Sequence, residues 1–304
     1  MSREICVEID TSACTGCGAC VTICPHDTLS IVENRATVTG DDSLSCGHCA
    51  AVCPEDAITL TGYQPMTQGF QTFDPPHGLI KPGDFDAGSL VQLMASRRSC
   101  RNFKEKPVPM EILEDLIQAG ITAPSGTNAQ LWNFSILPDR PSVLAFSGEV
   151  LRFFEKLNRL ATMAPLRTLL KWVGKPELAA YHQNYFHRIE EGIACWKEQK
   201  WDRLFHGAPS AIIVSCDHEA SCGAEDALLS TGQMLLAAHA MGLATCLIGF
   251  AISAMAHDKG VQEAARIPIN ETAHAVIAVG WPNETYRRPA LRKKVIPRVV
   301  RLER

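Results

Sequence analysis

Residues 14–25 read CTGCGACVTICP, and residues 46–54 read CGHCAAVCP. The first run holds four cysteines at the spacing Cys-x2-Cys-x2-Cys-x3-Cys-Pro, and its last three cysteines recur 29 residues later in the second run. The short apolar segments that follow, 28–31 and 57–60, also correspond. Each copy is predicted to form a cysteine loop, a short helix and a strand, so that residues 1–62 make a two-fold pseudo-symmetric unit. Such a unit is too small to bury much of a core.

The cysteine spacing is typical of an iron–sulfur site. Three thiolates spaced in this way wrap one face of a cube-shaped cluster, and the fourth thiolate points away to ligate a second cluster. Gly16 and Gly18 lie between them and let backbone N–H groups approach the sulfides. Two other interpretations stay open, namely buried structural thiols and a zinc site, although zinc sites favour two separated pairs of ligands. A unit this small usually needs metal to hold it together.

This part of the chain resembles the bacterial two-cluster ferredoxins. The resemblance implies two sets of ligands, which are Cys14, Cys17, Cys20 and Cys53 for a 4Fe-4S cluster, and Cys24, Cys46 and Cys49 for a second cluster, either 4Fe-4S or 3Fe-4S. The chain departs from the family pattern at Ser43, which stands where an eighth cysteine is expected. Three interpretations remain: ligation by the Ser43 oxygen, water or an outside thiol on the corner iron, or loss of that iron. His48 is not counted as a substitute, because a Gly-His pair also occurs in intact members.

Residues 63–88 form a linker rich in proline and glycine, and its apolar side chains predict that it lies over a surface. From residue 89 onward helices alternate with strands. Helices are predicted at 89–95, 110–119, 149–172, 176–200 and 223–241, and strands at 134–137, 211–216, 244–248 and 273–279. This mixed order predicts an α+β fold for residues 89–304.

Four segments of this region carry groups suited to a flavin nucleotide. Residues 97–103 (RRSCRNF) offer three cations and a hydroxyl, which suit a phosphate. Residues 123–132 (APSGTNAQLW) form a turn whose amides and hydroxyls can meet the donors and acceptors of a flavin edge. Residues 242–249 (GLATCLIG) end on a glycine that permits close approach to a flat ligand, and residues 286–294 (YRRPALRKK) are again basic. Taken alone, each segment also has an ordinary structural interpretation, which in the order given is a helix end, a loop, a core strand and a basic tail.

Together, and in this order, the four segments make the chain similar to the FMN-dependent nitroreductase family, and most similar to members with an N-terminal ferredoxin domain. The resemblance implies that one group of side chains contacts the ribityl phosphate or the flavin, namely Arg97, Arg98, Ser99 and Arg101. It further implies that Arg292 and Lys293 close on the phosphate and that Arg288 assists them.

The same resemblance assigns residues to the flavin ring. Asn128 is expected to meet the isoalloxazine rim, in a loop shaped by Pro124 and Ser125. Ile248 and Gly249 are expected to present their backbone near the reactive nitrogen. The loop departs from the family pattern at two positions, Gly126 and Leu131, where serine and proline are common. Members of this family are homodimers with FMN between the subunits, so a homodimer is expected here.

Composition and charge exclude other classes of function. The net charge is −4 and no long basic run occurs, so neither a nucleic acid nor an anionic membrane surface is favoured as a partner. Residues 235–256 lack charged side chains over a length that could span a bilayer, but we interpret them as a buried helix ending at Gly242 and a buried strand, with no membrane span. Residues 1–4 lack the apolar core of a signal peptide, and unpaired cysteines suit a reducing compartment, which predicts a cytoplasmic protein.

The sequence thus predicts an oxidoreductase in which iron–sulfur clusters feed FMN. Its electrons are expected from a low-potential donor or NAD(P)H, and the reduced flavin would reduce a small organic acceptor such as a nitro compound, a quinone or an activated alkene. Two alternatives stay open. The flavin could oxidise a substrate while the clusters drain the electrons outward, or the protein could be an electron-transfer partner without a substrate of its own.

The serine at position 43 predicts two unequal clusters. An oxygen donor matches cluster iron less well than a thiolate, so the cluster on Cys24, Cys46 and Cys49 should be the more labile. Aerobic handling is expected to give a three-iron signal in electron paramagnetic resonance. Ser43→Cys should abolish that signal and restore a second four-iron cluster at a changed potential, because the ligand set changes. Two equivalent, air-stable four-iron clusters in the unchanged protein would contradict the argument.

Overall fold

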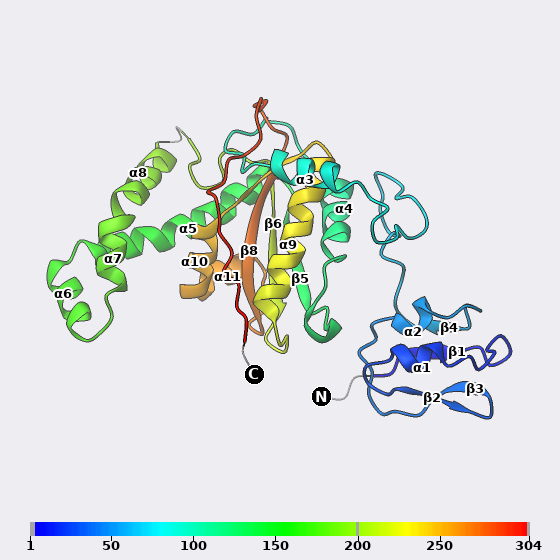
Figure 1. Ribbon diagram of the computed structural model, residues 1–304. Coiled ribbons are helices and arrows are strands. Elements are labelled where there is room, and N and C mark those ends of the chain that lie inside the picture. The colour runs from blue at the N-terminus through cyan, green and yellow to red at the C-terminus, as the bar shows by residue number, and fades with distance from the viewer. Residues whose placement is uncertain (1–3, 199–200, 303–304) are drawn as a thin grey trace.

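The structure is a computed structural model that describes residues 4–198 and 201–302. Figure 1 shows a small N-terminal unit beside a larger mixed domain. The small unit contains three elements from its first half and three from its second: β1 (Val7–Ile9), α1 (Ala19–Ile23) and β2 (Leu29–Val32), then β3 (Arg35–Val38), α2 (His48–Ala51) and β4 (Ile58–Leu60). The predicted order of cysteine loop, short helix and strand is confirmed in both copies. Strands β1 and β3 were not predicted.

The small unit has two antiparallel strand pairs and little else. β1 pairs with β4, and β2 pairs with β3 across a tight turn. Glu33 and Asn34 both have positive φ in that turn, as the two-residue hairpins that match strand twist require. The buried apolar cluster of this unit has four members, Cys20, Leu29, Ala36 and Ile58. So small a core cannot supply much stability without help from bound metal.

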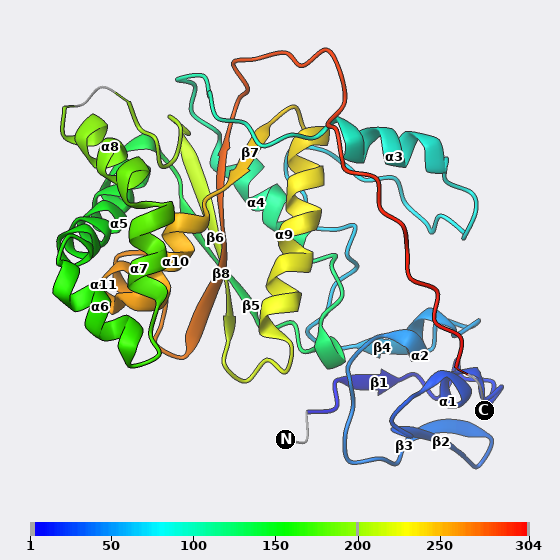
Figure 2. The same cartoon turned by 60° about the vertical axis from the view of Figure 1, so that its left-hand side comes forward.

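The larger domain is a four-stranded antiparallel sheet covered by helices on both faces (Figures 1 and 2). Its strands are β5 (Trp132–Leu137), β6 (Ser210–Asp217), β7 (Ala244–Leu247) and β8 (Glu271–Gly280). Their order in the sheet is β5-β6-β8-β7, so β8, the last strand in the chain, lies inside the sheet. The predicted α+β fold class is confirmed, and β5 and β8 each begin two residues earlier than predicted.

The helices include two that the sequence did not predict. They are α3 (Ala87–Ser96), α4 (Met110–Gly120), α5 (Arg140–Ala161), α6 (Ala164–Trp172), α7 (Glu177–Asn184), α8 (Phe186–Lys197), α9 (Gly223–Ala240), α10 (Gly249–His257) and α11 (Lys259–Ala264), with a short 3-10 turn η1 (Gly126–Asn128). The uncharged stretch 235–256 becomes the end of α9, strand β7 and the start of α10, and Gly242 turns the chain with φ 79°. None of the described helices has the length and apolarity to cross a membrane.

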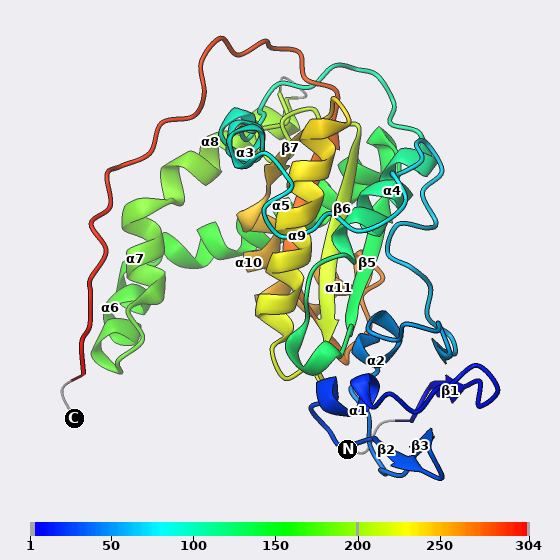
Figure 3. The same cartoon turned by 45° about the vertical axis from the view of Figure 1, so that its right-hand side comes forward.

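The two helical stretches predicted at 149–172 and 176–200 are each broken in two. The first begins earlier, at Arg140, because the Asp139 carboxylate accepts from Ser142 N–H and caps α5 at 2.8 Å. It breaks before α6, whose first turn holds a proline. The second breaks at Tyr185, where the backbone leaves the helical region. The predicted end at Lys200 lies outside the described residues. All four helices project from one side of the sheet (Figure 3).

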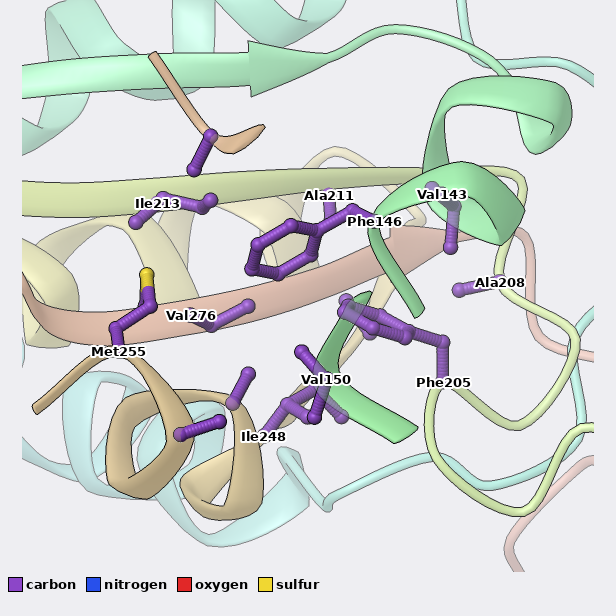
Figure 4. Close-up of a cluster of buried hydrophobic side chains, with 14 of the residues drawn as sticks. Val143, Phe146, Val150, Phe205, Ala208, Ala211, Ile213, Ile248, Met255 and Val276 are labelled. Atoms are coloured by element: carbon purple, nitrogen blue, oxygen red, sulfur yellow. The ribbon is translucent and has the colours of Figure 1, made fainter. Parts of the chain in front are cut away.

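Both faces of the sheet are buried, which explains why β6 and β8 read as unbroken apolar runs. On one face, α4 and α9 pack over Ile212, Val214 and Ile277. On the other face, Phe146 and Val150 of α5 and Met255 of α10 lie against the strands (Figure 4).

The linker is tied to α4 by polar contacts, whereas most of the apolar side chains on which its prediction rested, Phe73, Leu79, Ile80 and Phe85, are exposed. Gln71 and Thr72 donate their backbone N–H groups to the two carboxylate oxygens of Asp115, at 2.7 and 2.8 Å, and the Thr72 hydroxyl donates to the same carboxylate. Gln118 Nε2 also donates to Gln68 O at 2.7 Å. Asp115 is fully buried, so its charge depends on these donors for compensation.

Replacing Asp115 by Asn should release the linker. The amide keeps one acceptor but places a donor against an N–H group, so the free energy of unfolding of the larger domain should fall by about 1.5–3 kcal/mol. Residues 63–86 should then be cut faster in limited proteolysis. Glu105→Gln, at an exposed position in the segment before α4, is the control and should change stability by less than about 0.5 kcal/mol. Equal protease resistance in Asp115→Asn and the unchanged protein would refute the tether.

Candidate functional site

The cysteines of the small unit line two separate cavities. One is bordered by Cys14, Cys17, Cys20 and Cys53 together with the glycines between them. The other is bordered by Cys24, Cys46, Cys49 and Ser43. These are the two sets that the sequence resemblance implies, and the structure places the members of each set together. We call them the four-cysteine cavity and the serine cavity.

Hydrogen bonds reach the sulfurs of the four-cysteine cavity. Ala36 N–H lies 3.4 Å from Cys14 Sγ, and Ala57 N–H lies 3.3 Å from Cys53 Sγ. The backbone N–H groups of Ala36 and Gly16 lower the pKa of the Cys14 thiol. Gly16 is required here, because a Cβ at its position would lie 2.2 Å from the Asn34 carbonyl oxygen. N–H donors to sulfur favour the thiolate form that cluster iron binds.

The serine cavity differs at one corner. Ser43 is buried, and its Oγ accepts a hydrogen bond from Ser45 N–H at 3.1 Å. Burial raises the pKa of the Cys24 thiol, but hydrogen bonds from Thr28 and from the following backbone outweigh it, so the net pKa is lowered. At Cys49 burial dominates and the pKa is raised. Among the described residues no three His, Cys, Asp or Glu side chains converge closely enough for a single metal ion.

A second group of predicted residues gathers where α3 ends. Arg98 Nη2 donates to Arg288 O at 3.3 Å and to Pro289 O at 2.9 Å, and its guanidinium lies 4.9 Å from the centre of the Tyr286 ring. Arg98 Nε is buried and has no hydrogen-bond partner among the residues that the structure describes. Arg97 lines the same depression. We call Arg97, Arg98, Tyr286 and Arg288 the arginine cradle.

The cradle is joined to strand β7. Ser99 bridges Thr245 in parallel, and Cys100 N–H donates to Thr245 O at 2.9 Å. Ile248 and Gly249 follow directly after this strand, where α10 begins, and Gly249 faces open space, since a Cβ there would meet nothing within 4 Å. Arg101 is exposed on this side, and its charge opposes the burial that raises the pKa of the Cys246 thiol. The structure therefore brings the first and third predicted segments together, along with the start of the fourth.

The structure does not bring Arg292 and Lys293 to the cradle. Ala290 N–H donates to Ala95 O, and beyond it the chain runs extended along the outside of the molecule (Figure 2). Arg292 Nη1 donates to its neighbour Leu291 O, and both basic side chains are exposed. Arg292 and Lys293 thus do not reach the cradle of their own chain, and their assignment to a phosphate stays a prediction.

The loop of Pro124, Ser125 and Asn128 lies away from the cradle, at the opposite end of α9. Gly126 N–H donates to Asp226 Oδ1 at 2.8 Å in the first turn of that helix, whereas the cradle depression is lined by His239 of its last turn. Helical rise over that interval is about 20 Å. We call residues 124–130 the amide loop.

The amide loop contacts the serine cavity. Asn128 Nδ2 donates to Leu44 O and to Ser45 O, both at 3.1 Å, and Ser45 directly precedes Cys46. The loop is also strained, because Thr127, Asn128 and Gln130 all have positive φ. Backbone strain of this kind persists where surrounding contacts enforce it and is common at functional sites.

Sequence reasoning missed several participants. Tyr286 lay inside a quoted basic segment but was not assigned, and the Leu44 and Ser45 carbonyls carry no side-chain signal. Asp226 is the clearest omission. It is buried, one of its oxygens has no partner, and an acidic residue in an apolar helix was a signal that could have identified it.

Comparisons with known proteins agree with both parts of the chain. The 4Fe-4S binding domain family matches residues 7–30. An iodotyrosine deiodinase from Drosophila melanogaster is 24% identical over 75% of this chain and 75% of its own length. Iodotyrosine deiodinase 1 from Sus scrofa is 31% identical over 40% of this chain, and the match spans only 35% of that relative. A nitroreductase from Desulfitobacterium hafniense, solved with bound FMN, has a TM-score of 0.49 at 24% identity, covering 67% of this chain and 93% of that one.

The match that covers most of the chain lies in the larger domain. The sequence pattern of the nitroreductase family spans residues 94–281. This range runs from the end of α3 through β8, and it includes Arg98, the amide loop and Gly249. The chain therefore belongs to the nitroreductase family.

Proposed function

We propose that the protein is an FMN-dependent oxidoreductase that receives electrons through two iron–sulfur clusters and reduces a small organic acceptor. The acceptors we propose are nitro compounds, quinones and activated alkenes. The relatives named as iodotyrosine deiodinases add iodinated phenols to the compounds that should be tested. The donor is a low-potential electron carrier or NAD(P)H, and the thiol-rich clusters suit the reducing cytoplasm.

The arginine cradle fits the phosphate of FMN. A phosphate monoester accepts charge-assisted hydrogen bonds, and Arg98 offers the buried Nε that the protein itself leaves unpaired. Arg97, Ser99 and Arg101 add donors or charge on the same side, and Arg288 is held beside Arg98 by its carbonyl. Glu284 also lines the depression, but Tyr286 Oη lies 3.1 Å from its carboxylate and donates to it.

The residues that follow β7, at the start of α10, fit the isoalloxazine ring of FMN. FMN, when bound, supplies the exchange between one-electron and two-electron chemistry that such a reduction needs. Gly249 leaves space for a flat ligand, Ile248 N–H is already engaged by Val276 O, and exposed Leu247 and Phe250 flank the glycine. Apolar side chains in these places exclude water from the reacting edge. Asn128 lies at the other end of α9 and its Nδ2 is engaged by Leu44 O and Ser45 O, so in the proposed homodimer it would offer its amide oxygen to the ring edge from the second copy, with Pro124 and Ser125 shaping its loop.

The two cavities fit iron–sulfur clusters better than single ions. Their thiols surround a space instead of converging on a point, as a cluster with several irons requires. We propose Cys14, Cys17, Cys20 and Cys53 as ligands of one 4Fe-4S cluster. For the other cluster we propose Cys24, Cys46 and Cys49, with Ser43 at the fourth corner.

The observation that carries the proposal is the contact of Asn128 with Leu44 and Ser45. It joins the loop assigned to the flavin directly to the backbone that leads into Cys46. A cluster at that cavity is therefore positioned to exchange electrons with a ring bound at the loop. We accordingly divide the chain into a cluster unit (1–62), a linker (63–88) and an FMN domain (89–304), and propose that it acts as a homodimer.

The test is anaerobic purification followed by iron, sulfide and flavin analysis, and then reduction of the acceptor panel. Arg98→Ala should lower flavin affinity about 10–100-fold, since it removes one hydrogen bond to a charged group, worth about 1.5–3 kcal/mol. Iron and sulfide content should be unchanged. Arg287→Ala, an exposed arginine on the same segment, is the control and should retain its flavin. Full flavin retention in Arg98→Ala would overturn the assignment of the cradle, and absence of flavin from the unchanged protein would overturn the function.

A further inference from the structure

Asp226 is a buried carboxylate beneath the amide loop. It lies in the first turn of α9 and is only 2% exposed. Its Oδ1 accepts the hydrogen bond from Gly126 N–H, whereas its Oδ2 is buried and has no hydrogen-bond partner among the described residues. No lysine or arginine in the part of the chain that the structure describes forms a salt bridge with it. Gly126 N–H and the N-terminal end of α9 therefore compensate this carboxylate only in part.

The hydrogen bond to Gly126 does not by itself require a charge at this position. A serine, threonine or asparagine side chain also accepts from a backbone N–H group, and each of them costs less to bury than a carboxylate does. An unpaired polar atom in a protein interior calls for an explanation of its own. The unpaired Oδ2 of Asp226 thus points to a role for the charge itself.

The charge of Asp226 already acts on a neighbouring thiol. Cys216, near the end of β6, is 1% exposed, and burial is the main cause that raises its pKa to about 11. Asp226 is the largest of the charges that add to this rise, ahead of Glu271 and Asp217. A thiolate is disfavoured there because it would place a second negative charge beside the carboxylate. An electron added to an iron–sulfur cluster is also a gain of negative charge, so the same carboxylate opposes it.

Asp226 is linked to the serine cavity through the amide loop. Gly126, which it binds, stands two residues before Asn128 in the short turn η1. Asn128 Nδ2 donates to Leu44 O and Ser45 O, and both of these residues line the serine cavity. In Figures 1 and 3 the cysteine-rich unit lies against this end of the larger domain. The contacts reach the serine cavity first, and the four-cysteine cavity lies beyond it.

We infer that the Asp226 carboxylate lowers the reduction potential of the cluster bound in the serine cavity and so makes that cluster a stronger reductant of the flavin. The inference rests on the proposed function, which assigns a cluster to this cavity. The effect is Coulombic, and the burial of Asp226 limits its screening by solvent and salt. Asp226 touches neither cofactor, so it is a positioning residue that holds a charge and the amide loop in place.

The electron balance shows why the potential matters. Each transfer oxidises the cluster by one electron and reduces the flavin by one electron. Two transfers, with two protons taken from solvent, complete the reduction of the flavin, and a low-potential one-electron donor restores the cluster. A negative charge near the cluster raises the free energy of its reduced form, so the electron leaves it more readily.

The test is a redox titration of the anaerobically purified protein, followed by electron paramagnetic resonance. Asp226→Asn removes the charge, keeps the size of the side chain and retains an oxygen that can accept from Gly126 N–H. We expect the potential of the serine-cavity cluster to rise, and that of the other cluster to rise by about half as much or less, because Coulomb energy falls with distance. Ser43→Cys assigns the two signals, since it alters the serine cavity alone. Single-turnover reduction of the flavin by prereduced clusters should be slower in Asp226→Asn.

Two variants serve as matched controls. Glu225→Gln removes the same charge one residue away, from an exposed side chain that solvent screens, so both potentials should stay unchanged. Asp226→Glu keeps the charge and lengthens the side chain, and it should keep the potential close to that of the unchanged protein. Equal shifts in Asp226→Glu and Asp226→Asn would assign the effect to geometry and overturn the inference. A shift in Glu225→Gln as large as in Asp226→Asn, or no shift in Asp226→Asn, would overturn it as well.

The outcome for the proposed function is separate. A lack of flavin or of the second cluster in the unchanged protein would refute that function, whereas unaltered potentials in the Asp226 variants would leave it intact. If Asp226→Asn does not fold, Asp226→Ser removes the same charge with a smaller side chain and takes its place in the titration. High salt gives an independent measurement: the difference between the uncharged variant and the unchanged protein should persist, because the carboxylate is buried. A difference that vanishes at high salt would contradict the inference.

Discussion

The pairing of β8 with β6 on one side and β7 on the other is the constraint on which the larger domain depends. β8 is the last strand in the chain, yet it lies inside the sheet, with eight residues in register with β6 and four with β7. Both faces of these strands are buried, so a slip in register would misplace every side chain that α5, α9 and α10 cover. The same register sets the level of Ser99 at one end and of Trp132 at the other. The separation between the arginine cradle and the amide loop is thus a property of the core.

The small unit depends on a different interaction. Its buried apolar cluster has only four members, and two cavities lined by cysteine lie beside that cluster. Metal ligation is therefore expected to supply folding energy as well as electron transfer. This unit is attached to the larger domain by polar contacts. The Asp115 carboxylate accepts hydrogen bonds from the backbone of the linker, and the Asn128 amide donates to the backbone carbonyls just before Cys46. Such contacts fix position, which matters for electron transfer, without requiring a large apolar interface.

Ser43 makes the two halves of the pseudo-symmetric unit different. The two copies share their helices, cysteine spacing and following strand, but only the four-cysteine cavity has a thiol at each corner. An oxygen at the corner of the other cavity changes the ligand set, which is one of the levers by which a protein sets cluster potential. That altered cavity is the one beside the amide loop. Under the proposed function, two sites of one sequence pattern would then differ in potential along the line that leads toward the flavin, and the serine would act on electron flow as well as on cluster stability.

Spacing and local pattern in the sequence determined much of this protein by themselves. Ligand sets, short helices and apolar strands depend on neighbours within a few residues or on an exact repeat, so the cysteine groups, the α+β class and nearly all of the long elements could be predicted. The break at Met163 has a local signal, the proline in the first turn of α6, whereas the break at Tyr185 and the helix that begins at Gly249 have no comparable signal in the sequence. Only the tertiary structure decided that Arg98 meets Arg288 and Pro289, that Asn128 turns toward Ser45, and that Asp226 lies buried under Gly126. Each of these contacts joins segments far apart in the chain, and their geometry is set by the register of the sheet, which no local pattern encodes.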